Sequence, residues 1–82
     1  MNQTIFSRLP FREQMNIMLN DAVPIGERND GINRYFLFQL NSFYIEGKYH
    51  IELQGVLGFK SFVDTEQLDL YMASVDIRSL FI

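Results

Sequence analysis

The sequence predicts an α+β fold with an N-terminal helix, an antiparallel β-hairpin, and a C-terminal helix or helix plus strand, the helices lying on one face of the sheet. Three observations support this fold class. Apolar residues recur at helical spacing over residues 8–21, they alternate over residues 34–57 around a glycine, and they return to helical spacing over residues 68–82. Residues 1–82 are expected to form a single domain, because a chain of this length has no room for a second core.

The first predicted element is a helix over residues 8–21. Ser7 is its expected N-cap, and Pro10 is tolerated in the first turn because its missing N–H would be unpaired there. Ile17 points away from the main apolar stripe, which is expected to face the core and carries Phe11, Met15, Met18, Leu19 and Ala22.

Residues 20–33 are predicted to be a surface loop, because Pro24, Gly26 and Gly31 interrupt them. The Asn-Asp-Gly stretch at 29–31 invites comparison with a calcium-binding loop. A calcium-loop register ending at Gly31 would put Gly26 and Arg28 where oxygen ligands belong, so a plain turn is predicted instead.

The central prediction is a hairpin that pairs residues 34–45 with residues 48–57 across a two-residue turn at Glu46-Gly47. A three-residue loop would mix the two faces, so the shorter turn is preferred. In this register one face is dry and the other is mixed, with Phe43 opposite His50. Residues 59–63 are an optional addition to the predicted hairpin, as a short third strand. The dry face is expected to contain Phe36, Phe38, Leu40, Tyr44, Ile51 and Leu53.

The C-terminal element is open to two interpretations, because residues 68–82 wound as a helix carry apolar residues on two opposite sides. Either the second side meets another subunit, or the helix ends near Ser74 and residues 75–81 form a strand. The second apolar side contains Leu70, Ile77 and Phe81.

The composition narrows the chemistry. The chain has no cysteine and a single histidine, His50, so no metal site and no cofactor are expected. No nucleophile has a recognisable setting, and the protein is expected not to be an enzyme. The net charge is −3, and residues 64–76 carry four acids and no base, a pattern that repels nucleic acid and membranes.

The favoured function is a small protein-interaction module that acts as a homodimer. A domain this small without disulfides or a metal is marginally stable alone, and its apolar surface exceeds what one such domain readily covers. The dimer interface is expected at Leu70, Ile77 and Phe81. No segment resembles a secretory signal or a membrane span, so a cytoplasmic location is expected.

Two alternatives remain open at this point. A nucleic-acid-associated regulator would use the mixed hairpin face, where stacking and cationic side chains are expected at Tyr35, Phe43, Lys48 and His50. A small-ligand-binding domain would use a pocket between the helices and the hairpin.

Overall fold

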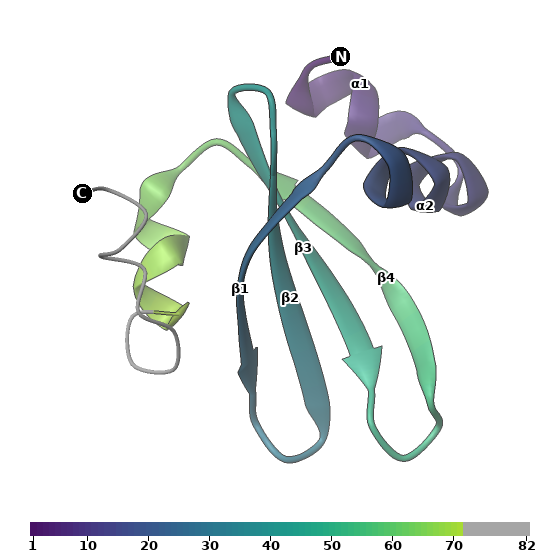
Figure 1. The fold of residues 1–82 in the computed structure, drawn as a ribbon, viewed down its shortest axis with the longest axis vertical. Coiled ribbons are helices and arrows are strands. Elements are labelled where there is room, and N and C mark those ends of the chain that lie inside the picture. The colour runs from purple at the N-terminus through teal and green to yellow at the C-terminus, as the bar shows by residue number, and fades with distance from the viewer. Residues whose placement is uncertain (72–82) are drawn as a thin grey trace.

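A computed structural model describes residues 1–71 of the chain, apart from the side chain of Leu70. Two helices precede a four-stranded antiparallel sheet with strand order β1-β2-β3-β4, and a short 3-10 helix follows it (Figure 1). The α+β class is therefore confirmed. The elements are α1 (Gln3–Arg8), α2 (Phe11–Asn20), β1 (Val23–Asn29), β2 (Asn33–Leu40), β3 (Phe43–His50), β4 (Gly55–Phe62) and η1 (Thr65–Tyr71).

The helix predicted over residues 8–21 corresponds to α2, which begins only at Phe11, and a separate helix that was not predicted, α1, precedes it. Leu9 and Pro10 are both extended, with ψ of 148° and 152°. A residue before proline is disfavoured in the helical region, which explains why α1 ends at Arg8. The cap of α1 is Asn2, whose side chain accepts a hydrogen bond from the N–H of Ile5 at 2.9 Å. No helix in residues 1–71 is both long and apolar enough to cross a membrane.

The predicted loop over residues 20–33 contains a strand, β1. Pro24 and Gly26 are compatible with it because β1 lies at the edge of the sheet, where proline and bulges are tolerated. The register shifts between Pro24 and Gly26, so Ile25 is the extra residue of a bulge. The turn predicted at 29–31 does connect β1 to β2, and the Asp30 carboxylate accepts hydrogen bonds there from the N–H groups of Ile32 and Asn33.

The predicted hairpin is wrong in its turn and therefore in its register. The chain reverses at Asn41-Ser42, so Leu40 pairs with Phe43 and Phe38 pairs with Ile45. The six residues predicted to share the dry face do not lie together on one side of the sheet. Tyr44 lies on the opposite side of the sheet from Phe38 and Leu40, while Ile51 and Leu53 belong to the turn after β3.

The error has a physical cause, which is that both faces of the sheet are covered. On one side the core contains residues of α1 and α2 and the sheet residues Leu40, Phe43 and Ile45. On the other side η1 packs against the sheet through Leu68 and Tyr71. When both faces of a strand are covered, apolar residues occur at successive positions, so alternation alone does not fix the register.

The helices therefore do not share one face, contrary to the prediction. Figure 1 shows α1 and α2 on one side of the sheet and η1 on the other. The predicted third strand at 59–63 is part of the longer β4, and the sheet has four strands. The alternatives for residues 75–82 lie outside the described residues.

Candidate functional site

The orientation of α2 leaves part of its apolar surface uncovered. Its buried side chains are Gln14 and Met18, with Ile17 partly buried beside them. The Gln14 amide donates a hydrogen bond to the carbonyl oxygen of Phe6 at 2.9 Å, which ties α2 to the end of α1. Phe11 and Leu19, which the sequence assigned to the core, are 45% and 78% exposed.

The uncovered side of α2 forms one wall of an apolar groove. The floor and the opposite wall come from β2, β3 and β4. Phe11 of α2 stacks on Phe59 of β4, with ring centroids 5.4 Å apart and planes 20° apart. The groove is lined by Met15, Met18, Leu19, Phe36, Phe38, Gly47, Lys48, Tyr49, Val56 and Phe59.

Gly47 shapes the floor of this groove. It pairs with Phe36 on β2 and with Phe59 on β4. A Cβ at position 47 would lie 3.3 Å from Cε1 of Phe59 and 3.9 Å from Cε2 of Phe38. The missing side chain therefore lets two aromatic rings approach the sheet. The sequence contains a sign of this, a glycine within an aromatic strand, but from the sequence alone that glycine is predicted to be part of a turn.

The size and lining of the groove decide what it can hold. Its cavity is about 140 Å³, and no polar atom contributes to the exposed lining. Small-molecule sites typically enclose roughly 300–1,000 Å³. An apolar cavity of about 150 Å³ takes a benzene-sized group. The groove is therefore matched to one apolar side chain rather than to a cofactor or a polar substrate.

Exposed apolar side chains surround the mouth of the groove. Leu19 and Phe11 project from α2, and Val56 on β4 is 39% exposed. Burying one large aliphatic side chain is worth about 1.5–3 kcal/mol. A partner that covers this surface would gain several such contributions. We call this surface, with the groove at its centre, the α2–β4 surface.

The predicted dimer interface cannot be compared with this surface. Ile77 and Phe81 lie outside the described residues, and for Leu70 only the backbone within η1 is described. That interface stays a prediction.

The predicted alternative binding face is brought together only in part. Tyr35 and Lys48 are direct cross-strand partners on β2 and β3. Phe43 is on the other side of the sheet, 1% exposed, with its ring 6.0 Å from that of Phe6. His50 ends β3, where its Nδ1 accepts a hydrogen bond from the N–H of Leu53 at 3.0 Å. The four residues therefore do not form one stacking platform.

A charged cluster occupies the same face as Tyr35. The guanidinium of Arg28 lies 3.8 Å from the centroid of the Tyr35 ring and 3.5 Å from a carboxylate oxygen of Glu46. The Tyr71 hydroxyl donates to Glu46 at 2.6 Å, and burial, followed by this bond, raises the pKa of Tyr71 well above its ordinary value. The cluster fixes η1 to the sheet and leaves Glu46 paired.

Acidic and histidine side chains do not gather into a metal site within residues 1–71. Asp30 has its pKa lowered by the backbone N–H groups of Asn33 and Ile32, which fits a turn-stabilising carboxylate.

No protein-family model matches the chain, and no curated protein and no solved structure matches it.

Proposed function

We propose that the protein is a non-enzymatic protein-interaction module that acts as a homodimer through its α2–β4 surface. The observation that supports this most is the groove itself, which is wholly apolar and matched in size to one side chain. Its surroundings point the same way, because Leu19 stands at its mouth with 78% of its surface exposed. The cytoplasmic location stays a prediction of the sequence.

A second copy of the chain is the partner that suits this surface. In a twofold dimer the same patch is used by both protomers, so a projecting group must lie close to a hollow that can receive it. Leu19 meets this requirement, because it lies on α2 at the edge of the groove that α2 forms with β2, β3 and β4. Each protomer would place Leu19 in the groove of the other.

The charges beside the groove suit the same arrangement. Arg12 and Glu13 lie on α2 and, with Met15 and Leu19, line a shallow hollow next to the groove. Two copies of α2 packed across a twofold axis can set the arginine of each against the glutamate of the other. Opposite charges at the rim of an interface favour correct pairing and suppress like-charge contacts.

The mass of the protein in solution tests the proposal. The wild-type protein is expected to sediment at twice the chain mass of 9.7 kDa. Leu19→Asp is expected to sediment as a folded monomer, because it puts a carboxylate into the apolar groove of the partner. Sedimentation equilibrium over a range of protein concentrations measures both, and circular dichroism reports whether the variant is folded.

Leu53→Asp is the matched control. Leu53 is 72% exposed, close to the value for Leu19, but it lies in the turn between β3 and β4 and does not line the groove. This variant is expected to remain a dimer. A wild-type monomer at every concentration, or a Leu19→Asp protein with wild-type mass, contradicts the proposal.

A further inference from the structure

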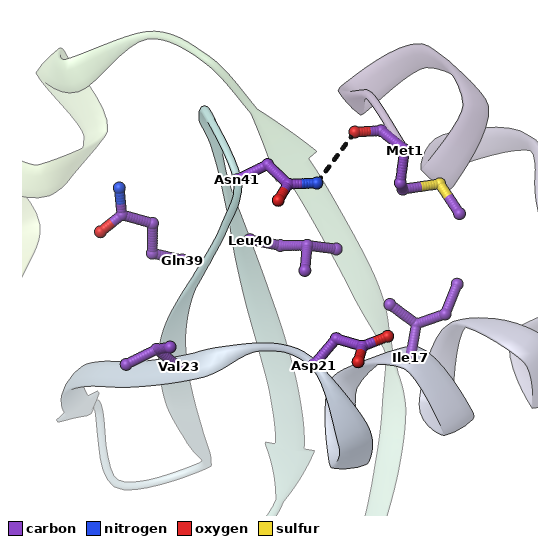
Figure 2. Close-up of a pocket in the computed structure, with 7 residues that line it drawn as sticks. All are labelled: Met1, Ile17, Asp21, Val23, Gln39, Leu40 and Asn41. Carbon is purple, nitrogen blue, oxygen red and sulfur yellow. Dashed lines mark hydrogen bonds between the residues drawn. The ribbon is translucent and has the colours of Figure 1, made fainter.

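A second cavity lies beside the C-terminal end of α2, and its lining comes from the N-terminus, from α2 and the residue after it, from the start of β1, and from the end of β2 and the turn that follows. Its volume is about 620 Å³, within the roughly 300–1,000 Å³ range of small-molecule sites. Figure 2 shows the lining residues, which are Met1, Ile17, Asp21, Val23, Gln39, Leu40 and Asn41.

Asp21 is the one charged side chain in this lining, and it has no internal partner. Within residues 1–71 its carboxylate forms no hydrogen bond or ion pair. It follows directly after α2, at the end where the helix dipole is negative, and the last turn of α2 contains no basic residue. Two sources of negative potential therefore meet at one point, and no cation among residues 1–71 forms an ion pair with the Asp21 carboxylate, although Met1, with its N-terminal ammonium group, lines the same cavity.

The remaining walls combine an amide with apolar side chains. The Asn41 amide nitrogen donates a hydrogen bond to the carbonyl oxygen of Met1 at 3.2 Å, which leaves its oxygen available as an acceptor. In Figure 2 this oxygen, the Asp21 carboxylate and the side chains of Ile17 and Met1 surround Leu40. The cavity thus offers two kinds of acceptor oxygen beside an apolar wall.

We propose that this cavity binds a small primary amine with a short aliphatic chain. Its ammonium group would bind the Asp21 carboxylate and the Asn41 amide oxygen, and its chain would pack on Leu40 and Ile17. A hard divalent cation fits less well, because calcium takes 6–8 oxygen ligands and this cavity supplies a single carboxylate. The site is separate from the α2–β4 surface and does not depend on it.

The test uses n-pentylammonium, with n-pentanol as a neutral probe of similar shape. Pentylammonium is expected to shift the backbone amide resonances of Asp21, Leu40 and Asn41 in a saturable way. Asp21→Asn is expected to weaken this binding about 10-fold or more, to the level of pentanol, because a neutral amide oxygen replaces the charged carboxylate as the acceptor for the ammonium group. Its melting temperature should not fall, since the substitution removes a charge that opposes the helix dipole.

Glu52→Gln is the matched control, because Glu52 is an exposed acid in the turn after β3, outside this cavity. It is expected to bind pentylammonium as the wild-type protein does. Equal binding of pentanol and pentylammonium would show an apolar site without ammonium recognition and would overturn the proposal. Unchanged binding by Asp21→Asn, or the absence of saturable shifts in the wild-type protein, overturns it as well.

Discussion

Gly47 lies in β3 directly beneath the ring of Phe59, so any side chain at this position meets that ring. The ring cannot move away freely, because Phe11 stacks on it and the Phe6 ring contacts it edge-on with centroids 6.5 Å apart. We expect Gly47→Ala to lower the free energy of unfolding by about 1 kcal/mol, since overpacking outweighs the small gain from replacing a strand glycine. Urea denaturation measures the change.

Gly58→Ala is the control for this prediction. Gly58 is also a strand glycine, but a Cβ there would have no heavy atom within 4 Å. The substitution is expected to be neutral or to stabilise by about 0.5–1 kcal/mol. Equal effects of the two substitutions would mean that the Phe59 ring does not constrain position 47.

Tyr71 connects η1 to the sheet through its hydroxyl group. Tyr71→Phe removes the hydrogen bond to Glu46 and is expected to lower the free energy of unfolding at pH 7 by about 1.5–3 kcal/mol, the range for bonds to charged groups. The pKa of Tyr71 is raised in the folded protein, so its contribution is complete below the unfolded value near 10 and is lost as pH rises further. The difference between the two proteins should therefore shrink above pH 10.

Tyr44→Phe is the matched control here. The Tyr44 ring stacks on Phe62 with centroids 5.7 Å apart, but its hydroxyl has no partner among residues 1–71. Its loss should change stability little at any pH. Denaturation curves at pH 7 and pH 11 would contradict the account if Tyr71→Phe behaved like Tyr44→Phe in both.

At the scale of elements, the position of the central turn is the feature most open to direct test. Asn41 has a φ of 55°, in the left-handed region that asparagine tolerates and glycine adopts freely. Asn41→Ala is expected to be about 1–2 kcal/mol less stable than Asn41→Gly. Both variants lose the same side-chain bond to Met1, so thermal denaturation of the pair isolates the backbone term.

If Asn41→Gly were less stable than Asn41→Ala, the result would favour the turn that the sequence predicted at Glu46-Gly47. In that arrangement Asn41 would lie within a strand, where glycine is less favourable than alanine by about 0.5–1 kcal/mol. The glycine variant would then be the less stable of the two.

The burial of both faces of the sheet limited how much of these elements the sequence could predict. Helical spacing located most of α2, and the turn before β2 followed from Asp30 and Gly31. Periodicity failed at β2 and β3 because both sides of these strands are covered, so apolar residues lie on both faces and conceal the alternation of the polar residues Gln39, Glu46 and Lys48 on the η1 side. Pro24 and Gly26 concealed β1, because edge strands accept residues that usually mark loops.

At the scale of the whole molecule, the sequence did not predict the α2–β4 surface, and the reason again lies in how apolar residues are distributed. The apolar residues of α2 cover more of the helix than the sheet can bury, and the sequence alone does not say which of them are left over. A hydrogen bond from a polar residue, Gln14, holds the helix so that Met18 faces the core and Leu19 does not. The sequence contains one sign of this orientation. Ile17 is apolar but lies outside the predicted stripe, which indicates that the buried side of α2 includes Ile17.

In the proposed dimer the α2–β4 surface is the interface between two copies of the chain, with Leu19 of one in the groove of the other. Isotope-filtered NOE spectroscopy on a mixture of labelled and unlabelled protein tests it most directly. We expect NOEs between the Leu19 methyl groups of one protomer and the rings of Tyr49 and Phe59 of the other. Strong intermolecular NOEs that involve other surfaces, with none from Leu19, would contradict it.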